Sequence, residues 1–189
     1  MRLFVAVDLE DTARTAIAAE QKRVAAAMGD ARWSVTWVKP DRMHLTLVFL
    51  GEVSDAHAPA IVDSVSRPVA RTAFSITFQG LGVFPSHGGP RALWVGITDG
   101  GADLSELQRE IARRVTDAGV VLDARPFHPH LTLGRWRQSR PSDRRRILSA
   151  SRPDIVARVA VPAATLYQSR ISSAGPTYTS LARATLSEM

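Results

Sequence analysis

A tetrapeptide that occurs twice constrains the fold of this chain more than any other feature of its sequence. His-Leu-Thr-Leu begins at His44 and again at His130. A residue type makes up less than roughly a tenth of an average chain, so chance would place a second Leu-Thr-Leu after another histidine on the order of a few times per thousand sequences. We therefore interpret the two copies as equivalent parts of a duplicated unit.

The elements predicted around the two copies recur in the same order. Alternating apolar residues indicate strands, and apolar residues at helical spacing indicate helices. The predicted strand, helix and histidine-bearing strand span 2–9, 11–28 and 44–50 in the first half, and 92–97, 103–118 and 130–136 in the second. Further strands are expected over 33–38, 74–80, 154–161, 163–170 and 176–186, and a further helix over 54–67.

This order predicts the fold class. We expect an α+β, bilobal, duplicated fold in which two lobes with antiparallel or mixed sheets face a central cleft and the helices lie outside. The arginine-rich segment 134–146 is expected to be an exposed connection, not a second domain, and its arginines could track an RNA backbone. Residues 1–189 would then form a single domain, which is an ordinary size for one hydrophobic core.

The net charge of the chain, +6, indicates an anionic partner such as nucleic acid or a phosphate ester. The positive charge is almost wholly arginine, since Lys22 and Lys39 are the only lysines. A guanidinium can bind a phosphate through two parallel hydrogen bonds. A chain rich in Ala and Arg is also what a GC-rich genome produces, so charge alone does not separate a binding surface from an ordinary solvated one.

Several classes of site and location are excluded by composition. The chain has no cysteine, which excludes disulfides, thiolate metal sites and a cysteine nucleophile. Its first apolar run is short and is followed by Asp8 and Glu10, unlike a signal peptide, and no stretch reaches membrane-spanning length. We expect a cytoplasmic monomer that does not associate with membranes.

The repeated tetrapeptide suggests a specific chemistry. Side chains alternate along a strand, so His44 and Thr46 share one face, as do His130 and Thr132, while the leucines point into the lobe cores. Two such faces across a cleft supply two imidazoles for proton transfer and two hydroxyls that can donate to a phosphoryl group. Histidine suits this role because its ordinary pKa, about 6.5, allows one copy to act as acid and the other as base.

Several segments of the chain, taken in order, resemble a known family. Together with the two H-x-T motifs, the segments "RLFVAVDL", "GVFPSHGGPRALWVGI" and "LYQSRISSAGPTYTSL" resemble the 2H phosphoesterase superfamily, and within it the RNA 2′,3′-cyclic phosphodiesterases, also called 2′-5′ RNA ligases. The resemblance implies hydrolysis of a 2′,3′-cyclic phosphate to a 2′-phosphate without metal or cofactor, with 2′-5′ ligation as the reverse reaction. It implies RNA with a 2′,3′-cyclic phosphate terminus as partner, such as a tRNA fragment, or a cyclic nucleotide.

The resemblance also assigns roles that the symmetric motifs leave open. It implies that His44 is the proton donor and His130 the proton acceptor. Thr46 and Thr132 match the threonines that hold the non-bridging phosphate oxygens, where charge builds up in the transition state.

Arg135 matches an arginine of the family that supports phosphate binding. Strict alternation along the strand would place Arg135 on the face opposite His130. A bulge or strand end at Gly134 would be needed to turn it inward. Where some relatives carry an aromatic residue on the first strand near the ligand, this chain has Phe4 and Val5.

Other residues allow other interpretations. His128 and His130 could suggest a metal pair, but no cysteine or nearby carboxylate completes a ligand set. His87, in the Gly/Pro segment before Arg91, is either a substrate contact or a solvated loop residue. Tryptophans that could stack on bases, or fill the core, are Trp33, Trp37, Trp94 and Trp136.

Two other functions remain as alternatives. The first is a non-catalytic RNA-end-binding module whose arginines hold phosphates. Binding alone needs no titrating residue on each side of a cleft, which favours the enzyme. The second is a metal-dependent hydrolase, which a chelator would inactivate.

Overall fold

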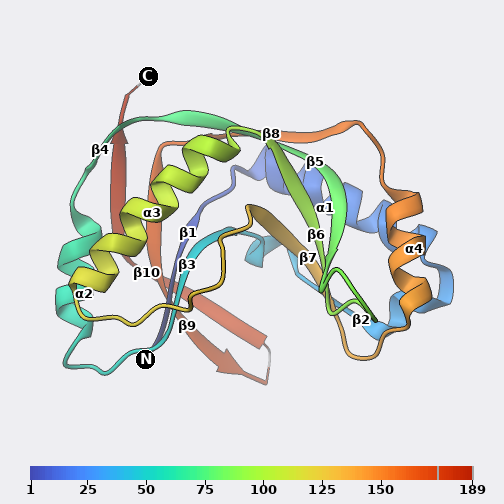
Figure 1. The fold of residues 1–189 in the computed structure, drawn as a ribbon, viewed down its shortest axis with the longest axis horizontal. Helices are drawn as coiled ribbons and strands as arrows, with labels where there is room; N and C mark the ends of the chain where they lie inside the picture. Colours follow the sequence, from blue (N-terminus) through green and yellow to red (C-terminus); the bar gives the residue numbers. More distant parts are fainter. Residues whose placement is uncertain (174, 189) are drawn as a thin grey trace.

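Two five-stranded sheets form the centre of the molecule (Figure 1), in a computed structural model that describes residues 1–173 and 175–188, except for the side chain of Trp33. The first sheet has the order β3 (Leu45–Glu52), β1 (Arg2–Val7), β9 (Ala163–Ser172), β10 (Gly175–Ser187) and β4 (Val69–Thr72). The second has the order β2 (Val35–Trp37), β7 (His130–Trp136), β6 (Ala92–Asp99), β5 (Phe74–Phe84) and β8 (Ile155–Val161). Neighbouring strands are antiparallel, except that β4 runs parallel to β10.

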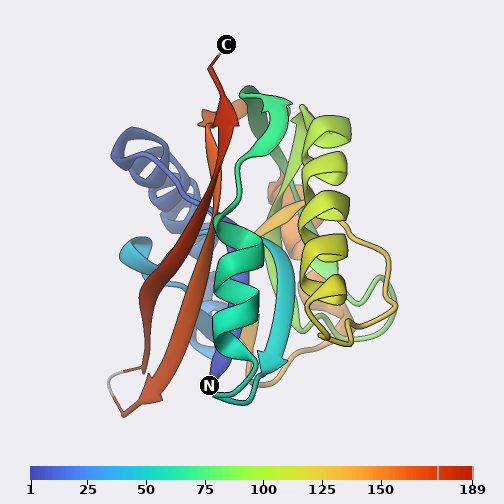
Figure 2. The same cartoon turned by 90° about the vertical axis from the view of Figure 1, so that its left-hand side faces the viewer.

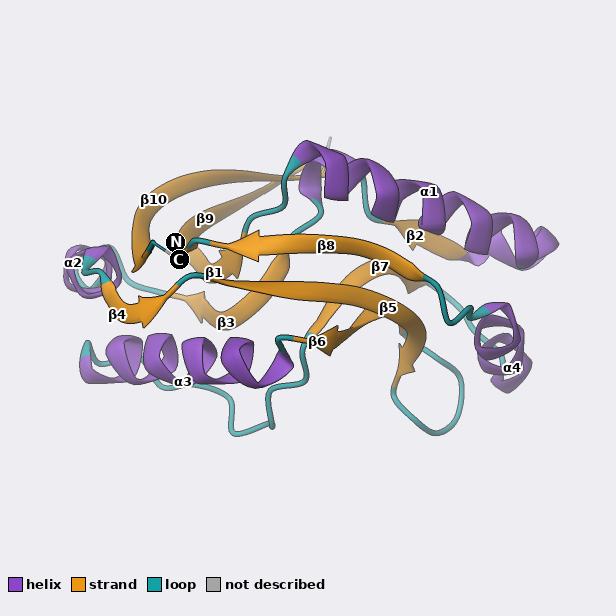
Figure 3. Ribbon diagram, turned by 90° about the horizontal axis from the view of Figure 1, so that it is seen from above, coloured by secondary structure: helices purple, strands orange, loops and turns teal. Residues whose placement is uncertain are grey.

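The helices lie on the outside of these sheets (Figure 3). They are α1 (Asp11–Ala27), α2 (Ala58–Ser66), α3 (Gly101–Asp117) and α4 (Pro141–Ala150). The apolar residues of α3 follow helical spacing and are fully buried: Leu104, Leu107, Ile111 and Val115. The α+β class, the two facing sheets and the outer helices predicted from sequence are confirmed. Within the described residues, no helix combines the length and the apolar character needed to span a membrane.

The two lobes are interleaved along the chain. The first sheet combines the N-terminal strands β1 and β3 with the C-terminal strands β9 and β10. Figures 1 and 2 show β1 in blue and β3 in cyan beside β9 and β10 in red. The helix α1 follows β1 of the first sheet but packs against β8 of the second. In turn, α3 follows β6 of the second sheet and packs against β3 of the first. Each lobe therefore depends on segments from distant parts of the sequence.

Some predicted elements differ from the structure. Segment 134–146 is not a single exposed connection, because it includes the end of β7 and the start of α4. The apolar face of α4 is narrow, with only Ile147 as a buried apolar residue, so its helical periodicity is weak. The strand expected over 33–38 is short, since a 3₁₀ turn covers Gly29–Ser34, and β4 was not expected.

Candidate active site

Both copies of the tetrapeptide line one cleft between the sheets. The cleft has a volume of about 340 Å³, and its lining includes Thr46 of the first sheet and His44, which immediately precedes β3, with His130, Thr132 and Arg135 from the second sheet. The strands β3 and β7 lie next to each other where the two sheets meet. The structure therefore brings together all five residues that the sequence singled out.

A β-bulge in β7 explains how Arg135 reaches the cleft. Thr132 and Gly134 pair with adjacent residues of β6, so Leu133 is the extra residue. The bulge resets the alternation of side chains by one residue, which turns Arg135 to the face that carries Thr132. Without the bulge, Arg135 would lie on the opposite face of the sheet.

The same bulge occurs in the first lobe. Thr46 and Val48 pair with adjacent residues of β1, so Leu47 is the extra residue there. Phe49 consequently lines the cleft, with 52% of its surface exposed. Phe49 stands five positions after His44, as Arg135 stands five after the other histidine. Phe49 was not among the residues predicted to line the site, although the sequence already contains this shared offset.

A buried glutamine stabilises the bulge of β7. The carbonyl oxygen of Leu133 accepts hydrogen bonds from the backbone nitrogen of Val38 at 2.9 Å and from Nε2 of Gln21 on α1 at 2.8 Å. Gln21 is 8% exposed and also donates to the carbonyl oxygen of Val38 at 2.8 Å. The neighbouring Gly134 has no room for a side chain, because a Cβ there would lie 2.6 Å from Cγ1 of Val35.

Both histidines are oriented by the same kind of hydrogen bond. Nδ1 of His44 lies 2.8 Å from the carbonyl oxygen of Arg42, and Nδ1 of His130 lies 2.6 Å from that of His128. A carbonyl oxygen only accepts, so each Nδ1 must carry a proton. In both residues Nε2 is therefore the atom that can gain or lose a proton.

The surroundings of His44 act on its pKa in both directions. Burial lowers the pKa of His44 below its usual value, because a charged imidazolium is poorly solvated there. The carbonyl of Arg42 and the carboxylate of Asp8 oppose this and raise the pKa, while the charge of Arg14 lowers it. Asp8 is thus the acidic residue whose charge favours a protonated His44.

Asp8 is held in place beneath an aromatic stack. Its carboxylate accepts hydrogen bonds from Oγ1 of Thr165 at 2.7 Å and from the hydroxyl of Tyr167 at 2.5 Å. Burial, with the bond to Asp8, raises the pKa of Tyr167 to about 12, so its hydroxyl keeps its proton. The Tyr167 ring stacks on the Phe4 ring with a centroid distance of 5.4 Å, and the Phe4 ring stacks on the His44 ring with a centroid distance of 4.8 Å.

His130 has surroundings of the opposite charge. Burial lowers the pKa of His130, the hydrogen bond to the backbone carbonyl of His128 opposes this, and the charges of His128 and Arg135 lower the pKa further. The His130 and Phe84 rings are in an edge-to-face arrangement with their centroids 5.1 Å apart, and the centroid of the Trp94 ring lies 6.0 Å from that of His130. The guanidinium of Arg135 has no hydrogen bond or ion pair within the described part of the chain, so it is available to a ligand.

The remaining wall of the cleft, on the His44 side, combines aromatic and apolar side chains with Arg2, Arg42 and Ser169. The Tyr178 ring meets His44 edge-on at 5.2 Å, and the guanidinium of Arg2 lies 4.9 Å from the centre of the Phe49 ring. Exposed Ile171 extends this wall. Sequence reasoning did not assign these residues to the site, because Tyr178 and Ile171 come from the distant C-terminal strands.

The tryptophans named from the sequence have different environments. Trp94 lies beside His130 and 5.0 Å from His128. Trp136 is buried in the core, and Trp37 packs against the core while partly exposed. The side chain of Trp33 lies outside the described residues. Of the three that are described, only Trp94 borders the histidine site.

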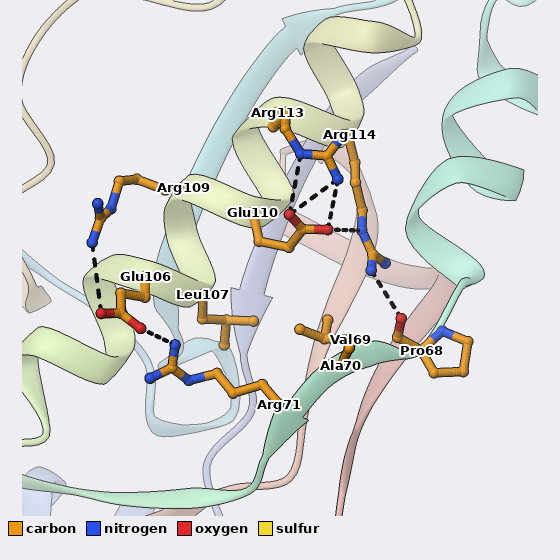
Figure 4. A pocket seen from close by; sticks show the side chains of 10 residues that line it. All are labelled: Pro68, Val69, Ala70, Arg71, Glu106, Leu107, Arg109, Glu110, Arg113 and Arg114. Atoms are coloured by element: carbon orange, nitrogen blue, oxygen red, sulfur yellow. Dashed lines mark hydrogen bonds and ion pairs between the residues drawn. The ribbon is translucent and has the colours of Figure 1, made fainter.

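A separate hollow between β4 and α3, of about 570 Å³, is lined by charged residues (Figure 4). Its cations are paired with its own carboxylates. The carboxylate of Glu110 forms ion pairs with Arg113 at 2.9 Å and with Arg114 at 2.8 Å, and Arg71 forms an ion pair with Glu106. No described residue along this hollow is a histidine. It therefore offers neither a free cation for phosphate nor a residue that titrates near neutrality.

The chain is similar to proteins of known activity. The model of the 2′-5′ RNA ligase superfamily matches residues 10–170. The RNA 2′,3′-cyclic phosphodiesterase of Archaeoglobus fulgidus is 36% identical over 141 residues, which cover 75% of this chain and 76% of the relative. That of Methanothermobacter thermautotrophicus is 32% identical over 184 residues, 96% of each chain. The crystal structure of E. coli LigT complexed with 3′-AMP aligns with a TM-score of 0.76 at 28% identity over 98% of both chains.

Proposed function

The chain belongs to the 2′-5′ RNA ligase superfamily, and from that premise we propose that it is an RNA 2′,3′-cyclic phosphodiesterase. Water opens the cyclic phosphate at an RNA end and leaves a 2′-phosphate. The observation that carries this proposal is the cleft itself. It holds two histidines from two sheets, each with a proton fixed on Nδ1 and a threonine two positions further along the strand. Both histidines come from one chain, which supports action as a monomer.

The proposed mechanism uses the two Nε2 atoms in opposite roles. Nε2 of His130 removes a proton from water as the water oxygen attacks phosphorus. The bond from phosphorus to O3′ breaks on the opposite side, and protonated Nε2 of His44 gives its proton to O3′. The new hydroxyl remains on the 2′-phosphate. The enzyme is left with a protonated His130 and a neutral His44, and proton exchange with solvent restores the starting state.

The charges near each histidine support this assignment of donor and acceptor. A carboxylate favours a neighbouring imidazolium, whereas a guanidinium favours a neutral imidazole. Among the charged neighbours, Asp8 raises and Arg14 lowers the pKa of His44, whereas His128 and Arg135 both lower the pKa of His130. The donor is thus the histidine near the acid, and the base is the histidine near the cation.

Three residues of the cleft lining can donate hydrogen bonds to the charge that develops on the phosphoryl oxygens. The hydroxyls of Thr46 and Thr132 line the cleft beside the two imidazoles, and the Arg135 guanidinium is free to bind an oxygen anion. Donors already aimed at a developing charge need no reorganisation during the reaction, which is why such groups lower barriers effectively.

The nucleoside of the substrate belongs on the His44 side. O3′ is part of the terminal ribose, so the ribose and its base lie near the residue that protonates O3′. Phe49 and Tyr178 provide ring surfaces there, and base stacking on such rings is tolerant of sequence. We infer that the enzyme accepts RNA ends with different terminal bases.

The test is to incubate the protein with a short RNA that ends in a 2′,3′-cyclic phosphate and to determine the position of the phosphate in the product. We expect only the 2′-phosphate, because His44 protonates O3′. A 3′-phosphate product would show that O2′ leaves and that the substrate lies reversed in the cleft. An intact cyclic phosphate would remove the proposed activity.

A further inference from the structure

The sheet face that lines the cleft continues beyond the residues around His44. Side chains alternate along a strand, and β9 and β10 contribute alternate residues to the cleft lining: Ser169, Ile171, Pro176 and Tyr178. Ser169 pairs with Arg2 at the start of β1, and beyond this point β9 continues with β10 as a two-stranded hairpin. Figure 2 shows the turn end of this hairpin, in red, projecting beyond β1. The lining therefore extends away from His44 along the hairpin.

Cross-strand pairing arranges these side chains in rows at increasing distance from His44. The first row contains Phe4 and Tyr167, which are paired and stacked. The second row contains Arg2, two positions from Phe4 on β1. The third row contains Ile171, four positions beyond Tyr167 on β9. Successive rows are about 6.5 Å apart, so the third lies about 13 Å from the first. The rows present rings, a cation and an apolar surface in turn.

Arg2 is the cation of the second row. Within the described part of the chain its guanidinium makes no hydrogen bond or ion pair, and it lies 4.9 Å from the centre of the Phe49 ring. The carboxylate of Glu52, which pairs with Arg2 across the sheet, lies 3.8 Å from the N-terminal amine of Met1. No described residue of the cleft lining is acidic. A phosphate that reaches the second row thus meets a guanidinium with no carboxylate bound to it.

The cleft carries more positive charge than a cyclic phosphate can neutralise. Its lining includes Arg2, Arg42 and Arg135, whereas a cyclic phosphate has a single negative charge. Burial raises the pKa of Tyr178, and the positive charges of these three arginines oppose the rise, so the field of all three reaches this hydroxyl. In an RNA strand, the next negative charge is the phosphodiester on the 5′ side of the terminal nucleoside.

The hairpin that carries the third row is fixed to the body of the protein. A Cβ at Gly175, where φ is +99°, would collide with Nη1 of Arg42, so the hairpin packs closely on this side chain. Oγ of Ser172 donates to the carbonyl oxygen of Gly175 at 3.0 Å. Ile171 is 71% exposed although it lines the cleft. The third row is therefore an apolar surface that is held in place and open to a ligand.

The cleft also opens on the His130 side, where the attacking oxygen of the proposed reaction enters. A hollow of about 790 Å³ there shares His130 and Arg135 with the cleft, and its described lining lacks His44. Ala92 pairs with Arg135 and leaves this space because it is small. The rest of the RNA is bonded to O5′ of the ribose that contains O3′, so the strand leaves the cleft on the His44 side.

We propose that the second and third rows form a subsite for the RNA strand on the 5′ side of the cyclic phosphate. Arg2 binds the first internucleotide phosphate, and Ile171 packs against the penultimate base. This inference rests on the proposed function and deepens it, because it makes a strand of at least two nucleotides a better substrate than a cyclic mononucleotide. A guanidinium can bind a phosphate through two parallel hydrogen bonds, and contact of a base with an aliphatic side chain does not depend on its hydrogen-bonding edge.

The experiment compares kcat/KM for three substrates with the same reacting group. They are adenosine 2′,3′-cyclic phosphate, the same compound with a methyl phosphate diester on O5′, and the dinucleotide ApA with a 2′,3′-cyclic phosphate end. The second adds one charge and no base, and the third adds the base. We expect a rise of about tenfold from the first to the second, for a hydrogen bond to a charged group. We expect about fivefold more for the third, which corresponds to about 40 Å² of covered apolar surface.

Variants assign each increase to its row. Arg2→Gln should bring the ratio of kcat/KM between the second and first substrates close to one, and should keep the ratio between the third and second. Ile171→Ser should keep the former ratio and bring the latter close to one. Arg170→Gln is the matched control, because Arg170 is exposed next to Ile171 on β9 but lies outside the cleft lining. It should keep both ratios.

The failures of this subsite and of the proposed function look different. A protein that hydrolyses none of the three substrates would overturn the proposed function, and the subsite with it. Equal kcat/KM for all three, or a first ratio that Arg2→Gln leaves unchanged, would overturn the subsite while hydrolysis continues. Loss of the first ratio in Arg91→Ala, in the hollow on the His130 side, and not in Arg2→Gln would also overturn it, because the strand would then leave by the other opening.

Discussion

The first and second lobes hold their histidines with the same backbone but surround them with different charges. In each lobe Nδ1 donates to the carbonyl two residues earlier, and the second leucine of the tetrapeptide is the extra residue of a bulge. Five positions after the histidine, the first lobe presents Phe49 and the second presents Arg135. Duplication thus explains the shared geometry, and later divergence at a few positions explains how equivalent histidines can perform opposite steps.

The difference extends beyond this one position. On the His44 side the charged residue that favours protonation is Asp8, and the cleft wall combines aromatic rings with Arg2 and Arg42. On the His130 side the neighbouring charges are positive, and Ala92 leaves an open hollow. One lobe is suited to a nucleoside and a proton donor, and the other to a phosphate and an attacking oxygen.

Removing either histidine should have the largest effect on activity. His44→Ala and His130→Ala should each lower kcat/KM by about 10²–10⁴-fold, the usual contribution of a general acid or base. The double variant should lose less than the product of the two, because each histidine contributes little without its partner. Steady-state assays on a cyclic nucleotide measure this, with exposed His57→Ala and added EDTA as controls that change nothing. Full activity in folded His130→Ala would contradict the mechanism.

Arg135 and Phe49, the equivalent residues of the two lobes, should affect different kinetic parameters. Arg135→Gln should lower kcat by about 10–100-fold, because a hydrogen bond to a charged group contributes roughly 1.5–3 kcal/mol. Phe49→Ala should mainly raise KM for RNA, by up to about tenfold, since stacking holds the base in the ground and transition states alike. If both variants changed the same parameter, the proposed division between the lobes would be wrong.

The charge of Asp8 should be visible in the pH profile. Asp8 raises the pKa of His44, so Asp8→Asn should lower that pKa. The limb of kcat/KM that falls as pH rises, where the donor loses its proton, should move to lower pH, and the other limb should stay. Tyr167→Phe keeps the carboxylate and serves as control, with a smaller displacement. If the rising limb moved instead, Asp8 would act on the pKa of the base and not on the pKa of the proton donor, which would contradict the account.

The bulge of β7 should depend on Gln21 for stability. Gln21→Leu removes the Gln21 hydrogen bonds to the part-buried carbonyl of Val38 and the buried carbonyl of Leu133, which should lower the free energy of unfolding by about 1–3 kcal/mol. Urea unfolding measures this change. Gln138→Leu, at an exposed position, is the matched control and should stay near wild type. An equal loss in both variants would show that Gln21 has no special role at the bulge.

The sequence predicted the parts of this site that are local. His-x-Thr alternation needs only a strand, so His44 with Thr46 and His130 with Thr132 could be paired without a structure. The inward turn of Arg135 needs a bulge, and a bulge is a property of two paired strands that one strand cannot show. The bond from Tyr167 to Asp8 joins residues 159 positions apart, and no periodicity reports such a contact.

The prediction that segment 134–146 is a single exposed connection was wrong for a related reason. Arg144 was grouped with its basic neighbours as part of that exposed connection. It lies instead on α4 and donates to the carbonyl oxygen of Pro85. A run of arginines looks uniform in sequence, and only packing separates the one that holds a loop from those that face solvent.

The central claim is that equivalent histidines have opposite roles, and the pH dependence of kcat/KM in wild type and in the two single variants tests it most directly. Burial lowers the pKa of both histidines, so the wild-type profile should be a bell with its maximum on the acid side of about 6.5. His130→Ala should lose the limb that rises with pH, since no base remains to be deprotonated, and His44→Ala should lose the limb that falls. Loss of the same limb in both variants, or of the opposite limb in each, would contradict the account.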